Sequence, residues 1–282
     1  MKIAAVQMVS TPDWPTNRAA AARLVAQAAA AGASLVLLPE YFCILGRRDT
    51  DKLALAEPAG EGPIQRFLAD TAREHGLWLV GGTFPVKTPA KDHVLNRCCV
   101  VSPDGVEAAH YDKIHLFAFD NGRESYDEGR TLDAGSAPVA LNAGALVHAG
   151  EPGGAAGHSE PIRVGLSICY DLRFPELYRA LMQPPCDLLC VPAAFTHTTG
   201  QAHWELLLRA RAVENQCYVL AAAQGGTHLN GRRTWGHSLI VDPWGEVLDV
   251  LPEGEGFVIA EVDPARIAQV RAQLPALQHR RL

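Results

Sequence analysis

The chain has 282 residues, of which 48% are hydrophobic and 20% are charged, and its formal net charge at pH 7 is −6. This length and composition are ordinary for one globular domain with a sizeable core, which we expect to span residues 1–282. An acidic chain without a large basic cluster argues against nucleic acid or an anionic membrane as a partner.

The first half of the chain alternates between strand and helix patterns. Short aliphatic runs are typical of strands buried on both faces, and apolar residues three to four apart are typical of helices. Ser102-Pro103-Asp104-Gly105 is a turn signal that joins the last two strands of this half in a hairpin. The predicted elements are the strand 3–7, the helix 18–31, the strand 35–38, the helix 63–75 and the strands 77–81, 94–101 and 106–111.

The second half repeats the alternation. Its predicted elements are the strand 164–168, the helix 173–182, the strand 187–191, the helix 201–216, the strand 218–223, a hairpin of 235–242 with 246–250, the strand 256–262 and the helix 264–274. Two such halves predict an α/β protein in which two mixed sheets carry helices on their outer faces. We therefore expect a four-layer α-β-β-α sandwich.

Two segments fit neither pattern. Residues 118–131 are rich in charge and contain two glycines, which predicts a mobile loop or lid. Residues 143–160 contain five glycines and little periodicity, which predicts a poorly ordered surface insertion.

Three residues with complementary chemistry each follow a predicted strand, namely Glu40, Lys113 and Cys169. Strand ends in α/β sheets converge on the ligand crevice, so we expect the three side chains to meet. Taken singly, each has an ordinary explanation as a loop charge, a surface lysine or a buried thiol. Together they supply a nucleophile, a general base and an ammonium that can lower the pKa of the thiol and stabilise an oxyanion. Cys186 and Cys190 lack the further ligands that a metal site needs.

Three motifs resemble those of the nitrilase, or carbon–nitrogen hydrolase, superfamily. They are Leu-Leu-Pro-Glu-Tyr-Phe ending at Phe42, Tyr-Asp-Lys-Ile-His-Leu-Phe around Lys113, and Ile-Cys-Tyr-Asp-Leu-Arg-Phe-Pro-Glu-Leu around Cys169. They fall in the family's order and spacing, and the resemblance covers nearly the whole chain. It implies the α-β-β-α sandwich, amide hydrolysis through a thioester without metal or organic cofactor, and a homodimer or higher homo-oligomer.

The resemblance also implies a role for each residue of the predicted site. Cys169 is expected to be the nucleophile, Glu40 the general base and later the general acid, and Lys113 the group that stabilises the tetrahedral intermediate. The family carries a further glutamate in the segment after the lysine. Glu124 and Glu128 both lie there, and Glu128 fits better because Glu-Gly-Arg-Thr-Leu resembles the family's sequence at that place.

The residues after the predicted nucleophile suggest a pocket for a linear, anionic amide. By resemblance, the backbone N–H of Tyr170 joins the lysine in binding the tetrahedral intermediate. Arg173 opens a predicted helix, where its guanidinium can hold a substrate carboxylate in a bidentate pair. Phe195, Thr198 and Thr199 are expected to complete a small polar pocket with one apolar wall.

Two further segments, 221–228 and 274–281, resemble the deaminated glutathione amidase branch of the family more than its ω-amidase branch. The former branch splits deaminated glutathione into 2-oxoglutarate and cysteinylglycine. The alternatives are an ω-amidase acting on 2-oxoglutaramate, another amidase, a nitrilase or a carbamoylase. A different class of function is a binding protein that keeps the fold but has no activity. The presence of Glu40, Lys113 and Cys169 argues against this alternative.

The sequence also predicts where the protein works. The first strand begins near Lys2, which leaves no room for a leader peptide, and no apolar run approaches the roughly 18 residues that span a bilayer. Seven cysteines at irregular spacings fit a reducing compartment better than a disulfide framework. We therefore expect a cytoplasmic protein whose partners are a small amide substrate and further copies of itself.

Overall fold

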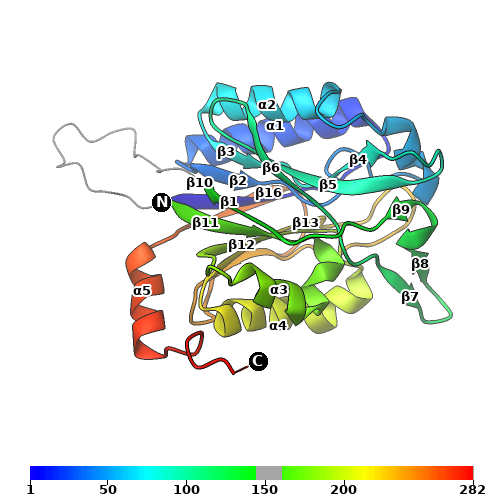
Figure 1. Ribbon diagram of the computed structural model, residues 1–282. Coiled ribbons are helices and arrows are strands. Elements are labelled where there is room, and N and C mark those ends of the chain that lie inside the picture. The colour runs from blue at the N-terminus through cyan, green and yellow to red at the C-terminus, as the bar shows by residue number, and fades with distance from the viewer. Residues whose placement is uncertain (144–160, 282) are drawn as a thin grey trace.

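Two β-sheets lie face to face, and helices cover the outer side of each (Figure 1). The computed structural model describes residues 1–143 and 161–281. The α-helices of these residues are α1 (Trp14–Ala30), α2 (Pro63–His75), α3 (Pro175–Leu181), α4 (His197–Asn215) and α5 (Pro264–Gln273). Because α1 and α2 cover one sheet and α3 and α4 cover the other, the predicted four-layer sandwich is confirmed.

The first sheet is built mainly from the N-terminal half. Its strands in the described residues are β1 (Lys2–Gln7), β2 (Leu35–Leu37), β3 (Trp78–Val80), β4 (Phe84–Lys87), β5 (Val94–Val101), β6 (Glu107–Asp112), β9 (Leu132–Asp133) and β16 (Gly256–Glu261). The order is β16-β1-β2-β3-β5-β4, and β6 and β9 also pair with β5. In β1, Ile3 and Ala5 face the second sheet while Ala4 and Val6 face the helices. Both faces are thus buried, which is why the strands read as aliphatic runs.

The second sheet has the same parallel centre. Its strands in the described residues are β10 (Val139–Ala143), β11 (Ile162–Leu166), β12 (Leu188–Ala193), β13 (Tyr218–Ala223), β14 (Ser238–Val241) and β15 (Val247–Leu251), in that order across the sheet. β11, β12 and β13 are parallel, and the helices α3 and α4 carry the chain back between them. The parallel strands of both sheets therefore end at one edge of the sandwich, where their following loops can meet.

Most of the segment 118–131, predicted to be a mobile loop or lid, is a hairpin. Its strands are β7 (Ala118–Asp120) and β8 (Ser125–Asp127). The side chain of Asn121 accepts a hydrogen bond of 2.8 Å from the backbone N–H of Glu124 and so fixes the turn between them. The charged composition alone did not reveal this local hydrogen bonding.

The last strand also departs from the prediction of two separate halves. β16 crosses over to the first sheet and pairs with β1 in antiparallel register, with Lys2 opposite Glu261. Of the predicted insertion 143–160, Ala143 ends β10 and the rest lies outside the described residues. In the part of the chain that the structure describes, no helix is long and apolar enough to cross a membrane.

Candidate active site

Glu40, Lys113 and Cys169 lie together at the edge where the strands end. Glu40 follows β2, Lys113 follows β6, and Cys169 begins the short 3-10 helix η3 after β11. The side chain of Gln224, just after β13, donates a 3.0 Å hydrogen bond to the backbone carbonyl of Glu40 and ties the two sheets together here. Only 1% of Glu40, 1% of Lys113 and 7% of Cys169 are exposed, so the three groups act on one another with little screening by water.

The nucleophile candidate sits on a strained turn. Cys169 has a φ of +49°, a left-handed conformation that costs a non-glycine residue about 1–3 kcal/mol. The buried carboxylate of Asp171 holds this turn in place. It accepts hydrogen bonds from the N–H of Ile168 (2.9 Å), the hydroxyl of Tyr111 (2.7 Å) and the N–H of His115 (3.0 Å). Since the last two residues flank the lysine, Asp171 fixes the thiol turn against the lysine segment.

Lys113 lies between two carboxylates. Its Nζ donates to Glu40 Oε1 at 2.9 Å and to Glu128 Oε2 at 2.7 Å. Burial alone lowers the pKa of Lys113, but Glu128 and Glu40 outweigh it and raise this pKa above its ordinary value. Glu128, in the 3-10 turn η2 (Glu128–Arg130), also accepts from the Tyr41 hydroxyl at 2.8 Å and the Phe117 N–H at 2.7 Å. Burial raises the pKa of Glu128, whereas Lys113 and these donors bring it below its ordinary value.

Two donors that the sequence analysis did not identify orient Glu40. The side-chain amide of Asn96 donates to Oε1 at 3.0 Å, and the backbone N–H of Ala194 donates to Oε2 at 2.9 Å. Asn96 carried a usable signal, because a buried amide inside a predicted strand needs a hydrogen-bond partner. Ala194 carried none, since it contributes only its backbone.

Lys113 lowers the pKa of the Cys169 thiol, as expected, but it does not bring this pKa below the ordinary value. Burial, and next the charge of Glu40, raise the pKa of Cys169 well above its ordinary value, and Lys113 offsets this only in part. The physical reason is that Lys113 already faces two carboxylates, so the cluster of Glu40, Glu128 and Lys113 carries a net negative charge. Ionisation of the thiol therefore requires a base. Glu40 and Glu128 both line the cavity with Cys169, and Glu40 has the stronger effect on the thiol pKa.

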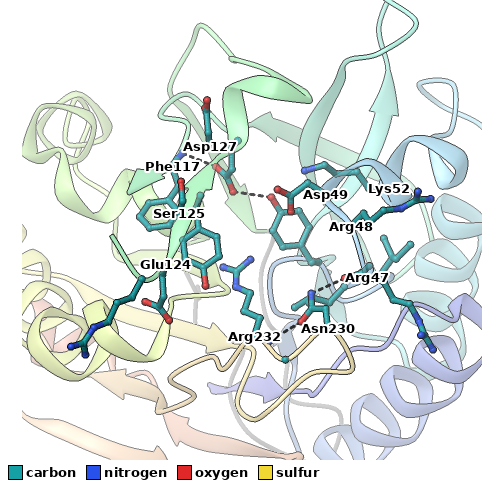
Figure 2. A pocket seen from close by; sticks show the side chains of 18 residues that line it. Arg47, Arg48, Asp49, Lys52, Phe117, Glu124, Ser125, Asp127, Asn230 and Arg232 are labelled. Carbon is teal, nitrogen blue, oxygen red and sulfur yellow. Dashed lines mark hydrogen bonds between the residues drawn. The ribbon is translucent and has the colours of Figure 1, made fainter. Parts of the chain in front are cut away.

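Two adjoining cavities lie at this site, and the thiol lines the inner one. The inner one has a volume of about 10 Å³, room for about one water, and both Glu40 and Cys169 line it. Four residues predicted to bind substrate also stand in its wall, namely Tyr170, Arg173, Phe195 and Thr199. The outer one has a volume of about 390 Å³ and opens under the β7–β8 hairpin (Figure 2).

Thr198 is absent from the wall of the inner cavity. Helix α4 begins at His197, earlier than predicted, because Thr196 caps it: its hydroxyl accepts a 3.4 Å hydrogen bond from the backbone N–H of Thr199. Thr198 is therefore already helical, and its hydroxyl donates to Glu124 at 3.1 Å. Glu124, the alternative to Glu128, thus lies at the hairpin surface rather than on Lys113.

The fold and this cluster place the protein among hydrolases that use a cysteine thiol on an α-β-β-α sandwich. The model of the carbon–nitrogen hydrolase family matches residues 2–272, and the chain belongs to this family. It is 42% identical over 280 residues to the deaminated glutathione amidase of Synechocystis sp. (strain PCC 6803 / GT-S), covering 98% of this chain and 97% of that protein.

Solved structures agree with this assignment. Nit3 of Saccharomyces cerevisiae, a member of branch 10 of the nitrilase superfamily, has a TM-score of 0.84 and 30% identity over 100% of this chain and 97% of its own. An amidase from Nesterenkonia sp. AN1 has a TM-score of 0.76 and 26% identity, covering 99% of each chain. In a Glu-to-Gln mutant of that amidase, acrylamide is added to the active-site cysteine.

Proposed function

We propose that the protein is an amidase that hydrolyses deaminated glutathione to 2-oxoglutarate and cysteinylglycine. The observation that carries this proposal is the buried pair of Glu40 and Lys113, hydrogen-bonded at 2.9 Å beside the thiol of Cys169. Amide hydrolysis through a thioester needs a thiol, a base and an ammonium, and this buried site contains all three. The choice of substrate is supported by the activity for which the Synechocystis relative is named.

In the first half of the proposed reaction, the sulfur of Cys169 attacks the amide carbon while Glu40 accepts the thiol proton. The oxyanion that forms is stabilised by the Lys113 ammonium and the backbone N–H of Tyr170. Glu40 then returns the proton to the amide nitrogen, and the C–N bond breaks. Cysteinylglycine leaves as the free amine, and the acyl group stays on sulfur as a thioester.

In the second half, a water molecule attacks the thioester carbon and Glu40 accepts one of its protons. The C–S bond breaks, Glu40 passes the proton to the departing thiolate, and 2-oxoglutarate is released. The hydrogen bonds from Asn96 and Ala194 hold the two oxygens of Glu40 in place through each transfer. Glu128 keeps the Lys113 ammonium at the same position throughout.

Arg173 is the proposed partner of the carboxylate on the acyl side. Its guanidinium lies over the rings of Tyr170 (5.8 Å) and Phe195 (5.4 Å) and has one hydrogen-bond contact of 3.2 Å, to His203. No carboxylate pairs with it among the described residues. The inner cavity has room for only about one water, so the Arg173 side chain must move for an acyl group to enter. The guanidinium then pairs with the carboxylate of the acyl group.

The test is a comparison of kcat/KM for deaminated glutathione and 2-oxoglutaramate, following the formation of 2-oxoglutarate from both. A higher value for deaminated glutathione supports the proposal, whereas a clear preference for 2-oxoglutaramate assigns the protein to the ω-amidases. Titration of Cys169 with a thiol alkylator, with and without substrate, separates an enzyme from a silent scaffold. Substrate protects the thiol only where the two react at the same site.

We further propose that the protein is cytoplasmic and forms homodimers. All seven cysteines are free and buried, as suits a reducing compartment. Leu206 and Val213 of α4, with Trp244 after β14, are large apolar side chains exposed by 68%, 49% and 56% on the outer helix layer. A second copy would cover them, and light scattering coupled to gel filtration measures the assembly directly.

A further inference from the structure

The outer cavity adjoins the reacting groups, yet the proposed mechanism assigns it no role. It shares Phe117, Glu128 and Arg232 with the inner cavity. Its volume of about 390 Å³ is typical of a small-molecule site, while the inner cavity has space for about one water. Of the two parts of a substrate amide, the larger leaving group therefore has space only on this side.

The charges around the outer cavity favour an anion. Three of its charged residues, Arg48, Asp127 and Glu128, have ion-pair partners in Asp51, Arg130 and Lys113. The lining groups that have no ion pair within the described residues are the cations Arg47, Lys52, Arg123 and Arg232 and the carboxylates Asp49 and Glu124. Cations thus outnumber carboxylates by two among the groups that remain to meet a ligand.

Lys52 is an ammonium that has no ion pair within the described residues. It lies on the 3-10 helix η1 (Asp49–Leu55), is half-buried, and has its Nζ 5.5 Å from the centre of the Tyr41 ring. Burial is the largest influence on its pKa and lowers it, since no carboxylate in the described residues lies at ion-pair distance. A half-buried cation of this kind gains stabilisation when an anion binds beside it.

Arg232 supplies a second cation from another side of the cavity (Figure 2). One nitrogen, Nη2, donates to the carbonyl of Ala194 at 2.8 Å, but Nε is buried without an acceptor in the described residues. The turn that carries it is anchored, because the side chain of Asn230 donates to the carbonyl of Gly46 at 2.7 Å and accepts from the N–H of Arg232 at 2.9 Å. The guanidinium is thus positioned before any ligand arrives.

We propose that the outer cavity is the subsite for the amine side of the substrate, where Lys52 and Arg232 bind the terminal carboxylate of a peptide leaving group. This inference rests on the proposed function and deepens it. It makes the two cations the residues that favour a peptide amide over a primary amide, since ammonia carries no carboxylate for them to bind.

The test compares two substrates in two proteins. The substrates are deaminated glutathione and its analogue in which the terminal carboxylate is a neutral carboxamide, and 2-oxoglutarate is measured for both. The proteins are the wild type and Lys52→Met, which keeps the side-chain length and loses the charge. Lys87→Met, at an exposed lysine ending β4 outside both cavities, is the matched control. Arg232 is not varied, because Ala194 links it to Glu40.

We expect the carboxamide to lower kcat/KM about tenfold in the wild type and in the Lys87→Met control. Lys52→Met should have a kcat/KM about tenfold lower than that of the wild type for the carboxylate substrate. For the carboxamide, its kcat/KM should equal that of the wild type. Wild-type inhibition by cysteinylglycine should likewise be about tenfold stronger than by cysteinylglycinamide. The last measurement needs no variant and is independent of folding.

Two failures can be told apart. If the wild type hydrolyses deaminated glutathione and its carboxamide equally well, or if Lys52→Met lowers both rates in the same proportion, the subsite is refuted and the proposed function stands. If the wild type does not hydrolyse deaminated glutathione, the proposed function fails and the subsite fails with it.

Discussion

Replacing Glu128 by Gln tests how the catalytic cluster is held. The Glu128 carboxylate accepts four hydrogen bonds, two from Lys113 and one each from Tyr41 and Phe117. A glutamine amide has the same shape but turns one acceptor into a donor, so at least one buried donor loses its partner. We expect unfolding to become easier by about 1–3 kcal/mol, which lowers Tm by about 2–5 °C in a chain of this size.

The same change weakens the proposed base. Without the charge of Glu128, the Lys113 ammonium faces Glu40 alone, and that carboxylate becomes a poorer proton acceptor. A loss of about 1.5–3 kcal/mol corresponds to a fall in kcat of about tenfold to a hundredfold. Thermal unfolding and release of 2-oxoglutarate are measured on Glu128→Gln and on Glu124→Gln, the control on the same hairpin. A larger loss in the Glu124 variant, or full activity in the Glu128 variant, would refute this reading of the cluster.

Four further outcomes are expected. Cys169→Ala and Glu40→Gln should each abolish turnover while the circular dichroism spectrum stays native, and substantial turnover by the alanine variant would rule out a covalent mechanism. Brief iodoacetamide treatment with mass-spectrometric mapping should label Cys169 first, since it is 7% exposed and each other cysteine at most 1%. Because Glu40 raises the pKa of the thiol, Glu40→Gln should move the midpoint of the labelling rate to lower pH, and an unmoved midpoint counts against it. Arg173→Ala should lower kcat/KM about tenfold to a hundredfold, and an unchanged value removes Arg173 from the site.

Much of the fold could be predicted from the sequence because its parallel strands are buried on both faces. Such strands appear as unbroken aliphatic runs, as at 35–38 and 218–223, and the segments between them carry the helical period. The pairing of β16 with β1 could not be predicted this way. That contact joins residues about 260 positions apart, and both strands would look the same in either sheet.

Some residues of the candidate site could likewise be predicted from the sequence, and others could not. Glu40, Lys113 and Cys169 were found because each stands at a strand end, where chain order is enough to place it. Asp171 and Arg232 act through contacts with residues that are distant in the chain. Asp171 lies within the motif around Cys169, but neither local sequence shows which distant residues these two side chains contact. The size of the effect of Lys113 on the thiol pKa could not be predicted for a related reason. The effect of Lys113 depends on how many carboxylates surround it, and that number exists only in the folded protein.

The two glutamates on Lys113 differ in a way that decides which one takes the thiol proton. All the acceptor positions of Glu128 are occupied by fixed donors, and its pKa lies below the ordinary value, so protonating it would break hydrogen bonds that hold the lysine. Both glutamates line the inner cavity with Cys169, but Glu40 has the stronger effect on the thiol pKa, and among the described residues its second oxygen accepts a single hydrogen bond, from the backbone N–H of Ala194. We therefore expect a proton that leaves the sulfur to reach Glu40 while Glu128 keeps the ammonium in place. Lys113 can then remain charged through the whole cycle, which is the condition for it to stabilise the oxyanion in both halves of the reaction.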